Sequence, residues 1–287
     1  MTRLALISMD VEDWHHLEYF AGSRPSAPAV SMLDGVDRFA AVLDEEGVPG
    51  TFFTLGEVAA AHGATLRTLA EAGHEIASHG PDHQLLKRVS TAEFVDSMRT
   101  HKDALEQVLG RPVSGYRAPC FSMDEAKLAR LPELGFRYDS SWIRFGAHPL
   151  YGSMDLTHWE EPVRGAWRDP SSGLVEFEVP MARTPLRKKL PAGGGAYFRI
   201  FPWMMTRALV RRFLAEGAGV YVFYIHPFEC SAVPGIDYPR GTGRGTRIRF
   251  QTGRQKTLPR LRRLFAELRA AGFTFSTCES AARVLAR

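Results

Sequence analysis

Short apolar runs alternate with longer amphipathic stretches along most of the chain. The runs predict buried strands at 4–10, 50–56, 74–80, 113–119, 136–142, 219–227 and 273–277. Apolar residues at helical spacing predict helices at 30–47, 64–73, 90–110, 124–135, 206–217 and 258–272. Ser90 and Glu93 form a capping-box pattern, and Gly110 ends that helix. Repeated strand–helix units indicate a parallel sheet, and about seven of them favour a closed or nearly closed barrel.

The alternation breaks down between residues 143 and 205, where glycine, proline and tryptophan separate short segments. We interpret 143–205 as a loop-rich insertion over one face of a single domain that spans 1–287. Within it, 191–199 is expected to be a flexible loop, and further along the chain an arginine- and glycine-rich loop is expected at 235–255. The predicted fold is α/β, a distorted (β/α)7 barrel with this inserted segment.

Composition excludes several classes of protein. The 287 residues are 45% hydrophobic and 24% charged, which is typical of a globular protein rather than a disordered or fibrous one. The net charge of +4 is too small to indicate nucleic-acid binding. Three widely spaced cysteines suggest neither a disulfide framework nor a cysteine zinc site. Asp10 interrupts the first apolar run, and no run approaches a membrane span, so we expect a cytoplasmic protein.

Polar residues of the kinds that perform catalysis follow the predicted strands. They are Asp10, Glu12 and Asp13 after the first strand, His79 and His83 after the third, Arg117 after the fourth, Asp139 after the fifth, and His226 after the strand at 219–227. The carboxyl ends of the strands in a parallel barrel meet on one face, where active sites are built. We therefore expect these side chains to form a single site.

His79 and His83 are separated by a spacing that allows two imidazoles to reach one metal ion. The pair alone is a weak signal, because solvated or capping histidines have the same spacing. Acidic residues after the first strand strengthen it, since two histidines and one carboxylate form a zinc site that leaves room for water.

Five segments resemble, in the right order, the motifs of one enzyme family. The segments SMDVEDW, HGPDH, YRAPCF, YDSSW and YIHPFE are similar to those of the NodB-homology polysaccharide deacetylases, carbohydrate esterase family 4. The resemblance covers roughly residues 4–142 and 206–278. It is closest to a bacterial branch that has DVED in place of the commoner DD pair.

The resemblance implies a role for each matching residue. Asp10 is the expected general base that accepts a proton from the attacking water, and Arg117 keeps it ionised and oriented. His226 is the expected general acid that protonates the leaving amine. Asp139 is expected to orient His226 and tune its charge.

The resemblance also implies a divalent metal cofactor held by His79 and His83. The third ligand stays open between Glu12, which matches a DxD spacing, and Asp13, because either carboxylate can complete a water-activating site. Zinc is the expected ion, although such ligands also accept cobalt, nickel or iron.

Further residues are candidates for substrate contact. The backbone N–H of Cys120 matches the oxyanion donor of the family, while a nucleophilic thiol there would compete for the metal. Trp142 is a candidate for stacking on a sugar, with core packing as its alternative, and Glu229 for contact with the substrate or with a catalytic residue. Five arginines between 240 and 254 form either an anion clamp or a solvated loop, with equal weight: Arg240, Arg244, Arg247, Arg249 and Arg254.

The sequence thus predicts a metal-dependent enzyme that removes the N-acetyl group of an amino sugar. The expected partner is an N-acylated sugar or glycan, from a surface glycan, an exopolysaccharide or an activated precursor, without nucleic acid or a membrane span. One alternative is a deformylase or another C–N hydrolase acting on a lipid- or nucleotide-linked amino sugar. The other is a glycan-binding barrel without catalytic activity. The oligomeric state is not predicted.

Overall fold

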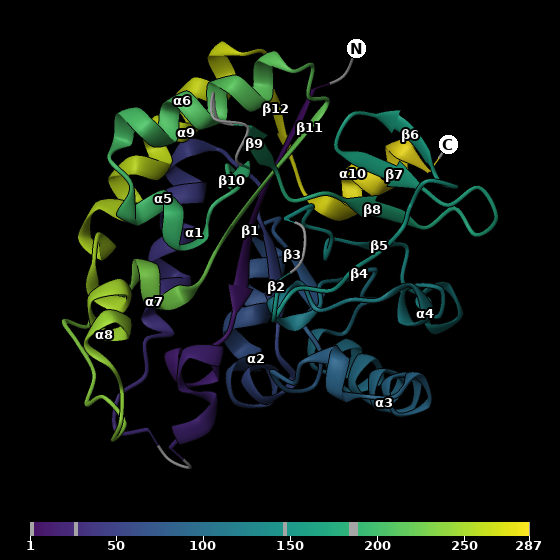
Figure 1. Ribbon diagram of the computed structural model, residues 1–287. Helices are drawn as coiled ribbons and strands as arrows, with labels where there is room; N and C mark the ends of the chain where they lie inside the picture. The colour runs from purple at the N-terminus through teal and green to yellow at the C-terminus, as the bar shows by residue number, and fades with distance from the viewer. Residues whose placement is uncertain (1–2, 26–27, 146–147, 184–188, 287) are drawn as a thin grey trace.

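A curled, mostly parallel sheet surrounded by helices forms the protein (Figure 1). The computed structural model describes residues 3–25, 28–145, 148–183 and 189–286. Within these residues the parallel strands follow the order β11–β1–β2–β3–β4–β5–β8, with antiparallel β7 and β6 continuing from β8, and β12 pairing with β1. The strands are β1 (Leu4–Val11), β2 (Thr51–Thr54), β3 (Glu75–Ser78), β4 (Gly115–Tyr116), β5 (Tyr138–Asp139), β6 (Glu160–Val163), β7 (Ala166–Arg168), β8 (Val175–Phe177), β9 (Met181–Arg183), β10 (Lys189–Pro191), β11 (Val220–Ile225) and β12 (Thr274–Ser276). The architecture confirms the α/β class and the distorted (β/α)7 barrel.

Helices pack around the outside of the sheet (Figure 1). They are α1 (Asp34–Glu46), α2 (Gly56–Glu71), α3 (Thr91–Leu109), α4 (Glu125–Leu128), α5 (Gly195–Ile200), α6 (Trp203–Ala215), α7 (Pro227–Cys230), α8 (Arg244–Gln251), α9 (Thr257–Ala270) and α10 (Cys278–Leu285). The capping box predicted at Ser90 and Glu93 begins α3, and Gly110 ends it in the left-handed conformation with φ of 67°. Across the described ranges, no helix combines the length and apolar character that crossing a bilayer requires.

The alternation of side chains along β1 separates two environments. Leu4 and Leu6 belong to the cluster inside the barrel, whereas Ile7 and Met9 belong to the cluster between the sheet and the helices. Because the period of a strand is two residues, Ser8, Asp10 and Glu12 continue the interior face. The barrel interior therefore changes from apolar to polar toward the carboxyl end of β1.

The interior is narrow, and irregular segments close it between β8 and β11. A side chain on Gly115 would overlap the ring of Tyr138, since a Cβ there would lie 1.9 Å from that ring. Backbone bonds from Gly219 and Val220 to the carbonyl of Arg164 join β11 to the β6–β7 turn, and the Tyr224 amide donates to Gly193. Hydrogen bonds outside regular strand pairing thus complete the barrel.

Several segments differ from the sequence-based prediction, among them α10, which was not predicted, and α2, which begins at Gly56 rather than at residue 64. The helix predicted at 124–135 ends at Leu128 and gives way to a 3-10 turn that begins at Pro132, which cannot continue an α-helical ladder. The predicted flexible loop at 191–199 contains most of α5, and the predicted loop at 235–255 contains α8. Both helices are fixed by tertiary contacts that no local pattern reveals. The ring of Phe250 in α8, for example, stacks on that of Phe228, with the centroids 4.6 Å apart.

Glu75 is a buried carboxyl group near the amino end of β3. Thr51 and the backbone N–H of Glu279 donate to its Oε2 at 2.9 and 2.8 Å, and Tyr138 donates to its Oε1. Burial raises the pKa of Glu75 to about 7 from 4.5, although these donors oppose the shift. The folded state therefore binds this proton more tightly than the unfolded state, and its stabilising effect is lost as pH rises from 4.5 through 7.

A Glu75→Gln variant should remove this pH dependence, because glutamine carries no ionisable proton. We expect the stability of the variant relative to the wild type to grow by about 3 kcal/mol between pH 4.5 and 7.5, as measured by urea unfolding. Glu71→Gln at the exposed end of α2 is the matched control, with the same change of charge and no such growth expected. A constant difference between Glu75→Gln and the wild type across this range would contradict the prediction.

Candidate active site

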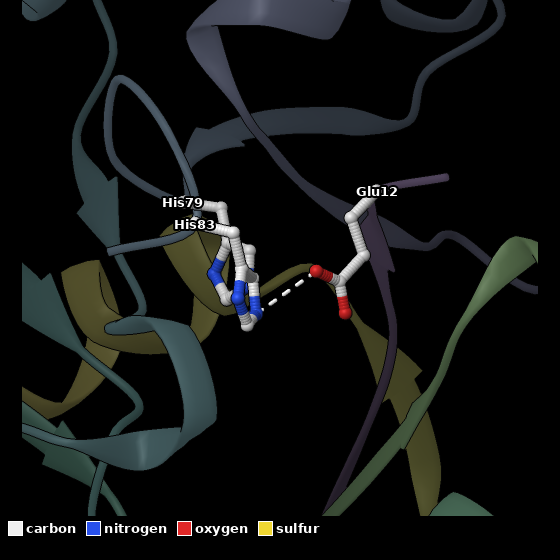
Figure 2. A group of neighbouring side chains, drawn as sticks. All are labelled: Glu12, His79 and His83. Carbon is white, nitrogen blue, oxygen red and sulfur yellow. Dashed lines mark ion pairs between the residues drawn. The ribbon is translucent and has the colours of Figure 1, made fainter. Parts of the chain in front are cut away.

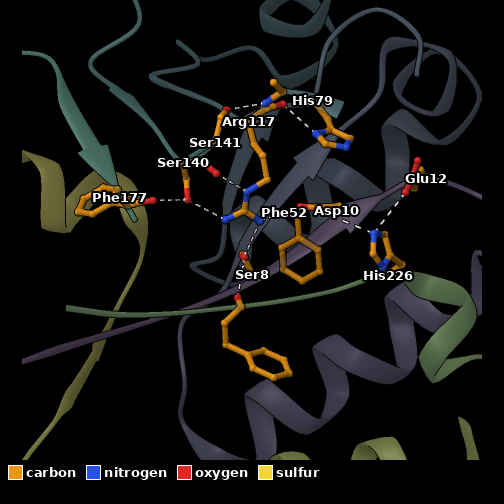
Figure 3. Close-up of polar contacts among 12 residues, drawn as sticks. Ser8, Asp10, Glu12, Phe52, His79, Arg117, Ser140, Ser141, Phe177 and His226 are labelled. Atoms are coloured by element: carbon orange, nitrogen blue, oxygen red, sulfur yellow. Dashed lines mark hydrogen bonds and ion pairs between the residues drawn. The ribbon is translucent and has the colours of Figure 1, made fainter. Parts of the chain in front are cut away.

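Arg117 and Asp10 form a buried ion pair beneath the carboxyl ends of the strands. The guanidinium Nη1 donates to Asp10 Oδ1 at 2.7 Å, and Arg117 has no exposed surface. Further bonds join the guanidinium to Ser8 Oγ, Ser140 Oγ and the Ser140 carbonyl at 2.8, 2.9 and 3.0 Å (Figure 3). The ring of Phe53 lies 4.0 Å below the guanidinium. Asp10 is thereby fixed in orientation next to a permanent positive charge.

Glu12, His79 and His83 bring one donor atom each to a common point (Figure 2). These atoms lie within 4.8 Å of one another, and all three residues are buried. His83 Nε2 is 2.9 Å from Glu12 Oε2. The Nδ1 of His79 is 2.8 Å from the carbonyl of Arg117, and donation to that carbonyl leaves Nε2 free as a ligand.

The protonation states of Glu12 and His79 suit a divalent cation. Burial acts to lower the pKa of His83, but the charge of Glu12 raises it above its usual value, so His83 must release a proton to bind the cation. Burial acts to raise the pKa of Glu12, but the positive charges of His83 and His226 lower it to about 2, so the carboxylate is ionised. Burial lowers the pKa of His79, which favours the neutral imidazole that binds metals. Glu12 Oε2 is buried and faces the Nε2 atom of His83. Two imidazoles and this carboxylate are thus a set that fits zinc or a similar ion.

Asp13 lies outside this group although it adjoins Glu12. Its Oδ1 accepts hydrogen bonds from the backbone amides of Trp14 and Met32 at 2.7 and 2.9 Å. It caps the 3-10 helix Trp14–His16, and the capping box is completed by His16. Of the two carboxylates left open by the sequence, the geometry groups Glu12 with the histidines.

His226 lies across from the candidate ligands, at the end of β11. Its Nε2 is 3.4 Å from Glu12 Oε1 and 4.0 Å from Asp10 Oδ2 (Figure 3). Its Nδ1 and its backbone nitrogen both lie 3.1 Å from Glu229 Oε2. Burial acts to lower the pKa of His226, but the bond to Glu229 and the charge of Glu12 more than offset it, so the pKa lies above its usual value.

Glu229, and not Asp139, therefore holds His226, which corrects the sequence-based role of Asp139. Glu229 Oε1 accepts a hydrogen bond from Arg199 Nε at 2.7 Å, and both residues are almost fully buried. Arg199 Nη1 in turn donates to the carbonyl of Arg249 at 2.6 Å. Burial acts to raise the pKa of Glu229, but His226 and Arg199 lower it, so the acceptor for His226 is a carboxylate.

Asp139 forms a separate buried pair with Glu176. Burial raises the pKa of Asp139 to about 6 and that of Glu176 well above its usual range, so the two carboxyl groups retain a proton at neutral pH. Asp139 accepts a bond from Ser141 Oγ, which accepts from the amide of Ala118 next to Arg117. Asp139 thus supports the backbone beside Arg117 rather than the imidazole.

A pocket of about 210 Å³ opens above these groups. Asp10, Glu12, His79, His83, His226 and Glu229 line its base. Aromatic side chains form much of its wall, namely Tyr19, Phe121, Phe145, Tyr151, Tyr197, Tyr224 and Phe228. Such flat apolar faces are suited to stacking on a sugar ring. Of the five arginines singled out above, Arg249 reaches the pocket, whereas Arg254 is buried against backbone carbonyls.

Two residues expected to contact substrate occupy different environments. Cys120 lines the pocket in a left-handed turn, with φ of 51°. Burial raises the pKa of its thiol, which disfavours a thiolate nucleophile. Trp142 is absent from the pocket wall and packs against Trp167, with the ring centroids 5.3 Å apart. Of the two roles considered for Trp142, the structure therefore favours packing over stacking on a sugar.

Several residues of the site carry no recognisable sequence signal. Arg199 lies in a segment expected to be a loop, and its partner Glu229 is 30 residues away. Tyr19 and Tyr151 reach the pocket from segments without a strand pattern. The position of Ser8 could have been predicted from the sequence, because a strand period of two residues places Ser8 and Asp10 on the same face of β1.

Two family models match adjacent parts of the chain. The first, described as polysaccharide deacetylase, matches residues 31–138, and the second, described as a domain of unknown function (DUF3473), matches residues 140–283. A peptidoglycan deacetylase of Helicobacter pylori is 23% identical over 155 residues, covering 50% of this chain and 52% of that protein. A chitooligosaccharide deacetylase of Bradyrhizobium sp. is 33% identical over 153 residues, covering 53% and 64%. The chain spans about half the length of the curated relatives it matches.

Solved structures extend the similarity of fold to the whole chain. A Mycobacterium smegmatis protein assigned to the polysaccharide deacetylases superposes with a TM-score of 0.64 at 22% identity, covering 99% of this chain and 90% of that one. A carbohydrate esterase family 4 pseudoenzyme of Bacillus anthracis superposes with a TM-score of 0.55 at 11% identity, covering 98% and 66%. Because the second protein is a pseudoenzyme, the fold alone does not establish activity, and the side chains of the site carry that argument.

Proposed function

The chain belongs to the polysaccharide deacetylase family, and from this membership we propose that it hydrolyses the N-acetyl amide of an amino sugar and releases acetate. The proposed substrate is a surface glycan, an exopolysaccharide or an activated precursor of one. The observation that carries the proposal is the convergence of Asp10, His226 and the group Glu12, His79 and His83 on one aromatic-walled pocket.

Glu12, His79 and His83 would hold the divalent cation of the proposed reaction. When bound, such an ion supplies Lewis-acid polarisation of the amide carbonyl and makes a nearby water more acidic. Asp10 accepts the proton of the attacking water, and its ion pair with the Arg117 guanidinium holds the carboxylate in a fixed orientation at the pocket. A free carboxylate in water is a weak base, and fixed placement next to the attacking water makes it an effective one.

His226 supplies the second proton transfer of the proposed reaction. Its Nε2 faces Asp10 and Glu12 across the base of the pocket, so an amide nitrogen bound between them lies within reach of the imidazole. Donation from Nε2 converts the leaving nitrogen into an amine, while Glu229 accepts a hydrogen bond from Nδ1 and stabilises the charged imidazolium. The backbone N–H of Cys120 is the proposed donor to the developing oxyanion.

Product analysis tests the proposal against its rivals. Purified protein, supplied with zinc, is incubated with N-acetyl and N-formyl amino sugars in free, nucleotide-linked and lipid-linked form, and acetate and formate are quantified separately. We expect acetate release from an N-acetylated sugar. Formate release alone would support the deformylase instead. Binding of a glycan panel without release of either acid, in protein shown to contain metal, would support a non-catalytic barrel.

Replacement of Glu229 by glutamine should slow the protonation of the leaving amine. The variant keeps the shape of the side chain but loses the negative charge that stabilises protonated His226, so we expect kcat to fall by about 10- to 100-fold with KM little changed. The loss should be larger for a sugar amide, whose leaving group needs a proton, than for an activated aryl acetate.

Asp139→Asn is the matched control for this prediction, since Asp139 was the sequence-based candidate for the same role. It should leave the ratio of amide to aryl acetate turnover at the wild-type value, because Asp139 contacts Ser141 and Glu176 instead of His226. An unchanged ratio in Glu229→Gln together with an altered ratio in Asp139→Asn would reverse the assignment.

A further inference from the structure

Positive charge is concentrated in two segments of the chain. Residues 189–215 and 238–266 contain 14 of the 36 Lys and Arg residues and none of the 32 Asp and Glu residues. The rest of the chain therefore has 22 cationic side chains for 32 acidic ones. These segments form α5, α6, α8 and most of α9, which lie along one side of the molecule (Figure 1).

The arginines of α8 form no ion pair with the acidic residues that the structure describes. Glu267 and Glu45 pair with arginines outside α8: Glu267 with Arg207 and Arg211, and Glu45 with Arg262. Arg244 and Arg247 are exposed, and in the part of the chain that the structure describes neither forms an ion pair. Their charge is therefore available to an anionic partner.

Exposed apolar side chains gather on the same side. Of the large apolar side chains that are exposed in the described ranges, five belong to it: Tyr19, Ile200, Met204, Met205 and Ile248. Ile248 and Met204 are 64% and 69% exposed, the highest values among them. Along α8, Arg244, Arg247 and Ile248 have the spacing of neighbours on one helical face, and all three are exposed, whereas Phe250 is buried.

Contacts of Arg249 connect this side of the molecule to the pocket. The guanidinium of Arg249 lies 5.1 Å from the ring of Tyr19, and both residues line the pocket. The carbonyl of Arg249 accepts a bond from Arg199, the neighbour of Ile200. We call this surface the basic face and define it by the exposed side chains of Tyr19, Ile200, Met204, Arg244, Arg247 and Ile248.

We infer that the basic face docks the protein on an anionic lipid bilayer. Arginines attract anionic headgroups, and exposed isoleucine and methionine side chains gain stability by entering the boundary between headgroups and acyl chains. A soluble polyanion would satisfy the arginines but would leave Ile248 and Met204 in water, so the combination favours a bilayer. Docking in this way sets the mouth of the pocket beside the membrane surface, where a lipid-linked glycan is carried; this last consequence rests on the proposed function.

Vesicle sedimentation of the full chain tests the inference without measuring catalysis. The probes are vesicles of phosphatidylcholine with and without phosphatidylglycerol, at low and high salt. We expect binding to the vesicles that contain phosphatidylglycerol, and weaker binding at high salt. Arg244→Gln combined with Arg247→Gln should lower the affinity for these vesicles roughly 25-fold, about fivefold for each arginine. Ile248→Ser alone should also lower the affinity relative to the wild type, although the variant remains folded.

The matched control changes an exposed arginine and an exposed apolar residue elsewhere. Val284 is 59% exposed on α10, next to Arg283, so Val284→Ser with Arg283→Gln should bind vesicles as the wild type does. Circular dichroism confirms that each variant is folded. The inference is overturned if the wild type does not bind vesicles that contain phosphatidylglycerol, or if it binds a soluble polyanion such as polyglutamate but no vesicles. It is also overturned if Ile248→Ser binds the vesicles as tightly as the wild type. It is overturned equally if Ile248→Ser changes only the oligomeric state.

Discussion

An Asp10→Asn variant is expected to lose turnover by about 1,000-fold while it keeps its metal ion. The asparagine can still accept a hydrogen bond from Arg117 through its carbonyl oxygen, but it cannot take a proton from water. The variant also leaves the buried Arg117 without its counter-charge, so a moderate loss of stability is expected as well. Steady-state kinetics, elemental analysis and thermal unfolding on one preparation separate these effects.

Ser8→Ala is the control for the loss of an Arg117 contact without the loss of the base. Ser8 Oγ accepts a bond from the same guanidinium at 2.8 Å, so this variant disturbs the position of Arg117 but retains the Asp10 carboxylate. We expect a far smaller fall in turnover than in Asp10→Asn. Equal losses in the two variants would show that Asp10 acts only by holding Arg117, and the role of base would be withdrawn.

Replacement of Glu12 by glutamine should lower the affinity for zinc by about 100-fold or more. An amide oxygen carries no charge to offset that of the cation, and the remaining imidazoles of His79 and His83 are both neutral ligands in the bound form. Metal content after dialysis against a weak chelator, and zinc titration of the apoprotein, measure this effect independently of activity.

Asp13→Asn provides the neighbouring comparison, because Asp13 was the other candidate ligand. Its Oδ1 caps a 3-10 helix by accepting backbone hydrogen bonds, which an asparagine oxygen also does, so we expect little change in the free energy of unfolding with zinc affinity retained. Loss of zinc in Asp13→Asn with retention in Glu12→Gln would overturn the ligand assignment that the geometry supports.

The prediction of the fold rested on periodicity, and it was most reliable where local signals are strong. The strand at 4–10 and the capped helix after Ser90 are found within a residue or two of the predicted bounds. The helices α5 and α8 were missed, because the burial of Arg199 and Phe250 against distant residues, rather than local pattern, stabilises them. Glycine-rich sequence resembles a loop unless such contacts are known.

For the site, the sequence placed Asp10, His79, Arg117 and His226 at the ends of parallel strands, and the topology of the barrel brings them together. It assigned Asp139 as the partner of His226, and this was wrong, since Glu229 is also an acidic residue near a strand end. The choice depends on which carboxylate points at Nδ1, a matter of side-chain direction and of the ion pair with Arg199.

The sequence by itself determined the alternating burial along β1, the parallel strand–helix architecture and the chemistry of the groups at the strand ends, because these follow from periods of two and 3.6 residues and from residue type. Tertiary structure alone decided that Glu12 rather than Asp13 joins the histidines, that Trp142 packs away from the pocket, and that the helices of two acid-free segments lie along one side of the molecule (Figure 1). Each of those outcomes depends on contacts between residues far apart in the chain, and such contacts are set only when the barrel closes.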